Sequence, residues 1–333
     1  MRLRFVFLVT AASASWAHVL DGHGREGAGV HVYSHDRRSH DLYHPLELFP
    51  ASEKRQNSRG KCSPPVFTGN TRRDWGEIDR PWPNVTIAKR TMTVPEDDTP
   101  QAIERFMLGE INPDPLPSDY DYNPIIWEDR TKDGEVTDIA TARDQKFEEN
   151  AFSWGTGGIC GCTVMVLISR KGVYVAHYWE SVSFNPDKRW LEHYGTKEAC
   201  FQKTVVTGLK KGVKGRKKTD PEQVSLTYFS ERLVDEHIRG YLMIPSEDND
   251  GAEDAYRNRW NEIKQVVGGM IPKLAENNRW TEVKYMALNE DDEDLKYKAN
   301  GKVLFKYDPN TDGKRKAMLW IESTEIDSDS WER

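Results

Sequence analysis

The stretch GICGCTVMVLISRKGVYVAHYWESVSF, residues 158–184, decides the local fold because it reads as two strands joined by a tight turn. Two apolar runs flank Ser169-Arg170-Lys171-Gly172, and the glycine at its end suits a two-residue hairpin loop. If Ser169 pairs with Gly172, then Cys162 faces Trp179 and His177 faces Val164. Cys162 and His177 would lie diagonally on one face, with Cβ atoms roughly 5–8 Å apart.

A thiol and an imidazole on one face suit nucleophilic catalysis. An ordinary thiol, with a pKa of about 8.5, is mostly protonated at neutral pH, so it needs a base to become the thiolate nucleophile. A third group must then hold the imidazole in one tautomer. Thr156 is the candidate for this role, and Ser153 is the reserve. Backbone N–H groups of a glycine-rich turn before Cys162 can stabilise an oxyanion; its glycines are Gly155, Gly157, Gly158 and Gly161.

A purely structural hairpin explains the same residues. Cysteine is among the most buried residue types, and one cysteine near one histidine arises easily by chance. Structural cysteines are chemically inert. The spacing alone therefore leaves both interpretations of Cys162 and His177 open.

Working outward, the whole chain has 333 residues, of which 37% are hydrophobic and 30% are charged. This is polar for a compact protein, so part of the chain is expected not to pack. A net charge of −7 is typical of a soluble acidic protein. It gives no reason to expect nucleic acid or an anionic membrane as a partner.

The first 17 residues predict a secretory signal peptide. Met1–Arg4 is a short basic region, Phe5–Ala12 is a short apolar core, and small residues follow at the cleavage positions. A buried N-terminal strand or helix is the alternative. No other segment is apolar enough to predict a transmembrane helix. The mature protein is therefore expected to be secreted and extracellular.

The remaining chain divides into two parts. Residues 18–137 are rich in Pro, Asp, Arg, Ser and Asn and predict a largely disordered region, with one short helix near residues 100–108. Asn84 begins a glycosylation sequon there. Residues 138–325 predict a globular α+β domain with a mixed or antiparallel sheet and two to three helices. Helices are expected at 138–152, 197–211 and 256–270, and strands at 224–229, 238–244, 283–288, 302–307 and 317–322.

Four cysteines in a secreted chain predict disulfides. If Cys162 is a working thiol, one bridge and one odd thiol remain. Cys160 with Cys200, or Cys62 with either of them, are all possible. Cys160 and Cys162 themselves sit too far apart along one strand for an easy bridge.

Short motifs add two resemblances. The residues GCT at 161–163, with His177 fifteen residues after the cysteine, resemble the active-site hairpin of the cytotoxic necrotizing factor type glutamine deamidases. The stretch from Thr156 to Cys162 is similar to the chemotaxis glutamine deamidase CheD, except that Cys160 replaces a glycine. This resemblance implies Cys162 as nucleophile, His177 as base and Thr156 as third member. Separately, AHYWES, GKVLFKYDP and AMLWIES resemble secreted fungal proteins of unassigned function.

Together these features predict a secreted cysteine amidohydrolase that deamidates, or with an amine transamidates, glutamine side chains of an unidentified protein substrate. No nucleotide loop, zinc spacing or haem motif occurs, and no cofactor is expected. A non-catalytic secreted effector or binding protein on the same fold is the main alternative. A cysteine peptidase is a third.

Overall fold

The computed structural model describes residues 60–62, 92–111, 122–124, 141–213, 223–246 and 253–333. The predicted signal peptide, the sequon at Asn84 and most of residues 18–137 lie outside these ranges. Within the described ranges, no helix combines the length and apolar character needed to cross a membrane.

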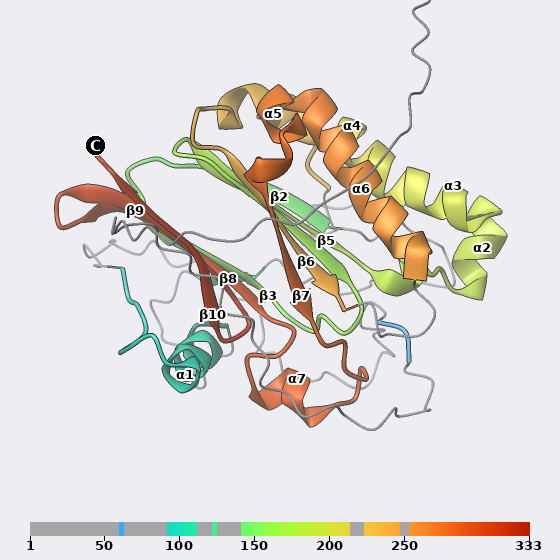
Figure 1. Cartoon of the computed structure of the whole chain (residues 1–333), viewed down its shortest axis with the longest axis horizontal. Helices are drawn as coiled ribbons and strands as arrows, with labels where there is room; N and C mark the ends of the chain where they lie inside the picture. The colour runs from blue at the N-terminus through green and yellow to red at the C-terminus, as the bar shows by residue number, and fades with distance from the viewer. Residues whose placement is uncertain (1–59, 63–91, 112–121, 125–140, 214–222, 247–252) are drawn as a thin grey trace, which may run out of the picture. The chain divides into compact units, whose positions relative to one another are not determined.

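The described strands form two five-stranded sheets (Figure 1). The first sheet has the order β1 (Tyr122–Pro124), β3 (Phe152–Thr156), β8 (Val303–Thr311), β9 (Lys314–Ile321) and β10 (Thr324–Trp331). The second has the order β2 (Thr141–Lys146), β5 (Gly172–Tyr178), β4 (Thr163–Ile168), β6 (Arg239–Pro245) and β7 (Trp280–Tyr285). The pairs β1/β3 and β6/β7 are parallel and the other pairs antiparallel, so both sheets are mixed.

The described residues also contain seven α-helices and several short helical turns. One of these helices matches the short helix predicted near residues 100–108, and the other six exceed the two to three predicted for the globular domain. The α-helices are α1 (Pro100–Ile111), α2 (Lys188–Tyr194), α3 (Lys197–Phe201), α4 (Thr207–Lys211), α5 (Leu226–Leu233), α6 (Glu253–Met270) and α7 (Glu293–Tyr297). The π-helical turns are η1 (Glu180–Phe184) and η2 (Gln202–Val206), and the 3₁₀ turns are η3 (Pro272–Ala275) and η4 (Asn277–Arg279). The α+β class is confirmed.

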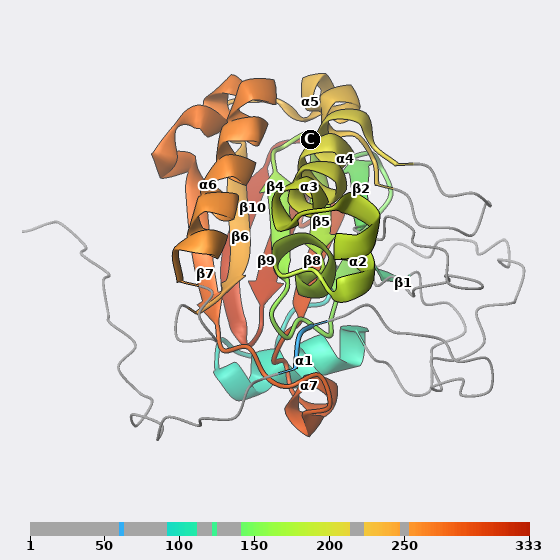
Figure 2. The same cartoon turned by 90° about the vertical axis from the view of Figure 1, so that its right-hand side faces the viewer.

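The elements stack in layers, each with its own apolar core. One core lies between the two sheets and is lined by alternate residues of β4 and β5 together with residues of β8 and β9. A second core lies between the other face of the second sheet and the helices α3–α6 (Figure 2). A third lies between α1 and the first sheet. The second sheet is therefore covered on both faces, which explains why β4 is apolar at nearly every position.

The predicted hairpin is confirmed as β4 and β5. The Ser169 N–H donates to the Gly172 carbonyl at 3.0 Å, and Val164 pairs with His177 as expected. The Ser169 Oγ accepts the Lys171 N–H at 3.0 Å, which closes the turn. Cys162 consequently lies on the same face as His177, toward the first sheet, as the alternation of strand side chains requires.

Two of the predicted elements have a different structure. Residues 138–152 were expected to be helical, but the described part forms β2 and the start of β3, because β2 pairs along β5 at the edge of the second sheet. Residues 224–229 were expected to form a strand, but α5 begins at Leu226. The Ser225 side chain caps this helix by accepting the Tyr228 N–H at 3.4 Å.

Several described elements lie outside the range 138–325 predicted for the globular domain. Helix α1 packs through Ile103 and Met107 against Trp320 of the first sheet. Strand β10 continues to Trp331, which packs against the core between the sheets. Cys62 is fully buried in that core.

Candidate functional site

Cys162 lies immediately before β4, at the end of the glycine-rich turn. Its carbonyl accepts the Tyr285 hydroxyl at 2.7 Å, and the next residue, Thr163, accepts the indole N–H of Trp260 at 2.9 Å. These bonds attach the start of β4 to β7 and to α6. The Cys162 side chain is fully buried.

His177 and Thr156 come from different sheets and meet across the core. The Thr156 Oγ1, on β3, lies 3.0 Å from the Nδ1 of His177, on β5. Both side chains are buried, and the ring of Trp179 lies 4.1 Å from the imidazole ring. The His177 Nε2 has no hydrogen-bond partner among the described residues. If Nδ1 donates its proton to Thr156, Nε2 is the nitrogen that can accept one.

The structure thus joins two of the three residues proposed from the sequence, Thr156 and His177, by a hydrogen bond, and it places Cys162 on the same face of the second sheet as His177. Ser153, the reserve for the orienting role, is an odd number of residues from Thr156 on the same strand. Side chains alternate along a strand, so Ser153 faces away from His177.

Burial shapes the titration of His177. The charged imidazolium would lose its hydration in the core, and this lowers the pKa of His177 from 6.5 to about 3. The imidazole is therefore neutral at neutral pH, and while it stays buried it is a weak proton acceptor, because burial disfavours the imidazolium.

This pKa predicts how stability depends on pH. The unfolded chain binds a proton at His177 as the pH falls through about 6.5, whereas the folded chain does so only near pH 3. The free energy of unfolding should therefore fall by about 2 kcal/mol between pH 7 and pH 5 through this residue. Urea unfolding at both pH values tests this, with His177→Gln as the non-titrating comparison. Equal pH dependence in the two proteins would contradict it.

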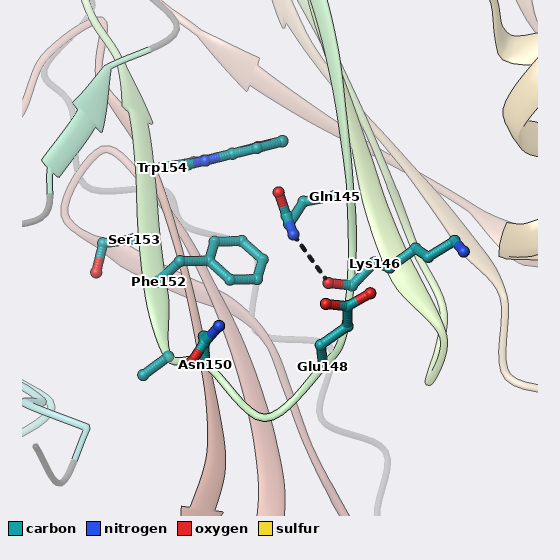
Figure 3. A pocket seen from close by; sticks show the side chains of 8 residues that line it. Gln145, Lys146, Glu148, Asn150, Phe152, Ser153 and Trp154 are labelled. Atoms are coloured by element: carbon teal, nitrogen blue, oxygen red, sulfur yellow. Dashed lines mark hydrogen bonds between the residues drawn. The ribbon is translucent and has the colours of Figure 1, made fainter. Parts of the chain in front are cut away.

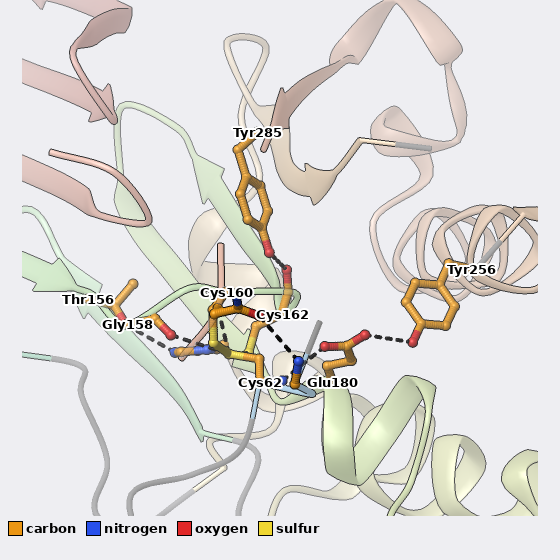
Figure 4. Close-up of a disulfide and its surroundings, with 11 residues drawn as sticks. Cys62, Thr156, Gly158, Cys160, Cys162, Glu180, Tyr256 and Tyr285 are labelled. Carbon is orange, nitrogen blue, oxygen red and sulfur yellow. Dashed lines mark hydrogen bonds between the residues drawn. A yellow bond between two sulfur atoms is a disulfide. The ribbon is translucent and has the colours of Figure 1, made fainter. Parts of the chain in front are cut away.

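A disulfide lies directly beside the candidate nucleophile. Of the pairings left open by the sequence, the structure selects Cys62 with Cys160, whose Cα atoms are 5.1 Å apart (Figure 4). The thiol of Cys162 lies 2.7 Å from the Sγ of Cys62. Cys200 is buried elsewhere, in the core near Trp190, and burial raises the pKa of its thiol.

The disulfide closes a loop of 98 residues in sequence and should stabilise the fold. Cross-linking a loop of this length restricts the unfolded chain, so we expect Cys160→Ser to lower the free energy of unfolding by about 2–5 kcal/mol. Urea unfolding measures this. A reductant should shift the wild-type transition to the position of the variant. A wild-type transition that is insensitive to reductant would contradict the prediction.

Residues Gly60–Cys62 are called here the cover segment. Main-chain hydrogen bonds hold its last residue, Cys62, against the site. The Cys62 N–H donates to the Glu180 Oε2 at 3.0 Å, and the Cys62 carbonyl accepts the Ser181 N–H at 3.0 Å. Next to it, Lys61 forms an ion pair with Asp187 at 3.4 Å. Figure 4 shows Cys62, Cys160 and Cys162 side by side, with Glu180 on the other side of Cys62.

Glu180 is a buried carboxylate at the start of η1, only 3% exposed. Its second oxygen, Oε1, accepts the hydroxyl of Tyr256 on α6 at 3.0 Å. From the sequence, Glu180 was assigned no role, and Cys62 was assigned only a possible disulfide bond with Cys160 or Cys200. A charged residue directly after an apolar strand is the signal that could have indicated Glu180, whereas the partner of Cys62 is visible only in three dimensions.

Two cavities lie away from these residues. One of about 220 Å³ opens between β2 and β3 and is lined by residues such as Gln145, Glu148, Phe152 and Trp154 (Figure 3). The other, of about 390 Å³, lies near the turn of the hairpin, where Arg170 pairs with Asp329 at 2.7 Å. Neither contains Cys162 or His177, because the cover segment and the sheets enclose them.

The described residues contain no group of three or more His, Cys, Asp or Glu side chains arranged to hold a metal ion. No protein-family model matches the sequence, and comparison with curated proteins finds no match. The geometry of the site is therefore the basis on which a function is inferred.

Proposed function

We propose that the protein is a secreted cysteine amidohydrolase acting on the carboxamide of glutamine side chains in proteins. The observation that carries the proposal is the hydrogen bond between Thr156 and His177, which orients the imidazole on the face that also carries Cys162. An imidazole held through Nδ1 presents Nε2 as a base. This arrangement is more specific than a cysteine near a histidine, because it requires a third side chain from another sheet.

The chemistry follows from these three roles. His177 takes the proton of the Cys162 thiol, and the thiolate attacks the carboxamide carbon. When the tetrahedral intermediate collapses, His177 returns the proton to the leaving nitrogen, and ammonia departs. Water, deprotonated by His177, then hydrolyses the thioester and leaves glutamate. An amine in place of water would give a transamidated product.

The burial of all three residues favours a second candidate, a secreted binding protein without turnover. In that case the hairpin would serve packing alone, and Cys162 would contribute as a small apolar side chain.

A turnover assay separates the candidates. The reduced full-length protein is incubated with an unfolded, glutamine-rich protein such as casein, and products are analysed by mass spectrometry. Deamidation converts a carboxamide to a carboxylic acid, so glutamine peptides should gain about 1 Da and ammonia should be released. Cleaved peptide bonds would indicate a peptidase instead.

The control variants are Cys162→Ser, expected to be inactive, and Cys200→Ser, which removes the thiol that is hydrogen-bonded to the Trp190 carbonyl. Glutamine conversion by the wild type and Cys200→Ser, but not by Cys162→Ser, supports the proposal. No conversion by any form, at several substrates, would leave the binding protein as the better description.

A further inference from the structure

We propose that Glu180 and the N–H of Ser181 form a subsite for the main chain of an extended peptide substrate, and that the cover segment occupies it until the Cys62–Cys160 bond is broken. The proposal deepens the function proposed above and rests on it. It implies that the substrate is a residue within an extended peptide. It also implies that the structure described here is a closed form, in which the cover segment fills the subsite.

The main-chain contacts of Cys62 are those of a bound peptide. Its N–H donates to the Glu180 carboxylate and its carbonyl accepts the Ser181 N–H, each at 3.0 Å. Every residue except proline offers this pair of groups, so the subsite would accept a main chain irrespective of side chain. The side chain of the bound residue is then directed toward Cys162, as required of an enzyme that modifies side chains.

The Sγ of Cys62 occupies the position that the γ atom of a bound residue would take, one bond before the carboxamide carbon of a glutamine side chain. It lies 2.7 Å from the Sγ of Cys162, and the backbone N–H of Cys160 points at it from 3.2 Å. A point within about 3 Å of both a nucleophile and a backbone N–H donor is the geometry sought for an acyl-transfer site. Cys62 therefore excludes any other group from this position.

The burial of Glu180 supports the assignment. A carboxylate is costly to bury unless its oxygens are hydrogen-bonded. The Tyr256 hydroxyl donates a hydrogen bond to one carboxylate oxygen, and the Cys62 N–H donates to the other. Once the cover segment leaves, a substrate N–H in the same place would restore that hydrogen bond.

Release requires a defined redox step. A dithiol reductant attacks the disulfide, forms a mixed disulfide and then closes its own ring, so the reductant loses two electrons and two protons. Cys62 and Cys160 each gain one electron and one proton and become thiols. The cover segment is then held only by its non-covalent bonds and can be displaced.

The test measures alkylation of Cys162 by iodoacetamide in the full-length protein, with peptide mass mapping and with Cys200 as the buried internal reference. Treatment of the wild type with dithiothreitol, or Cys62→Ser, should accelerate labelling of Cys162 by about tenfold or more, because the thiol becomes accessible. Cys200 should remain slow. Equal labelling of Cys162 before and after reduction, or equal acceleration at Cys200, would overturn the proposal.

The subsite itself is tested in the reduced protein with Glu180→Gln and a matched control, Glu231→Gln, exposed on α5. Replacing a charge-assisted hydrogen bond with a neutral one weakens the hold on the cover segment, so Glu180→Gln should label Cys162 about threefold to tenfold faster than the wild type. Glu231→Gln should match the wild type. Identical rates for all three proteins would overturn the role of Glu180.

Failure of this proposal can be told from failure of the proposed function. Labelling that responds to reduction and to Glu180→Gln, without glutamine conversion, would leave the closed subsite standing and remove the deamidase. If the oxidised wild type converted glutamine as fast as Cys62→Ser, the deamidase would stand and the closed subsite would be excluded.

Discussion

His177→Gln is expected to lower kcat for glutamine deamidation by about 10²–10⁴-fold, the range typical for loss of a general base. Thr156→Val should cause a smaller loss of about 10–100-fold, since an unpaired buried nitrogen costs about 1–3 kcal/mol. The hydroxyl of Thr156 acts only through the imidazole, so it is a positioning residue. The two variants are compared by steady-state kinetics on the reduced protein.

A positioning role for Thr156 predicts a distinct effect on the kinetic constants kcat and KM. Thr156→Val should lower kcat while leaving KM nearly unchanged, because the interaction matters only when the imidazole takes the proton. Thr156→Ser, which restores a hydroxyl, should recover much of the rate. The matched control is Ser153→Ala, which removes the hydroxyl on the opposite face of the same strand. Equal activity of Thr156→Val and Ser153→Ala would exclude a role for Thr156.

The hairpin and the order of the C-terminal elements were predictable because their signals are local. The apolar runs around Ser169 and Gly172 specify the register, and the aromatic spacing from Tyr256 to Met270 predicted α6. Strand β2 was missed because its residues, TARDQK, have no apolar alternation and are held by pairing with β5. Strand β10 is a polar edge strand and gave no signal for the same reason.

The candidate site was predictable only in part. Strand alternation placed Cys162 and His177 on one face, and the structure agrees. Thr156 was proposed from its place ahead of Cys162 and from a short resemblance, but no local rule predicts that β3 brings it to His177 from another sheet. The pairing of Cys62 with Cys160 joins residues 98 positions apart, and sequence alone left three possibilities open. Contacts between distant segments are what local patterns do not contain.

Gly301→Ala is expected to lower the free energy of unfolding by about 2–4 kcal/mol, since it combines backbone strain with a steric clash. Gly301 has a φ of +62°, which favours glycine, and an added Cβ would press on the backbone carbonyl of Ile159. Backbone there cannot move cheaply, because the Ile159 N–H donates to the Gly301 carbonyl at 3.1 Å. Urea unfolding provides the measurement.

Gly301→Ala should also change the geometry of the candidate site, because Ile159 begins the turn that carries Cys160 and Cys162. A displaced Ile159 shifts the disulfide and the nucleophile together, so we expect Gly301→Ala to lower deamidation at temperatures where it remains folded. Gly109→Ala is the control: Gly109 is exposed in α1 with open space around it, and alanine there should stabilise the helix by about 0.5–1 kcal/mol. If Gly301→Ala were as stable as Gly109→Ala, the turn would not depend on this contact, and some other feature would have to hold Cys162 in place.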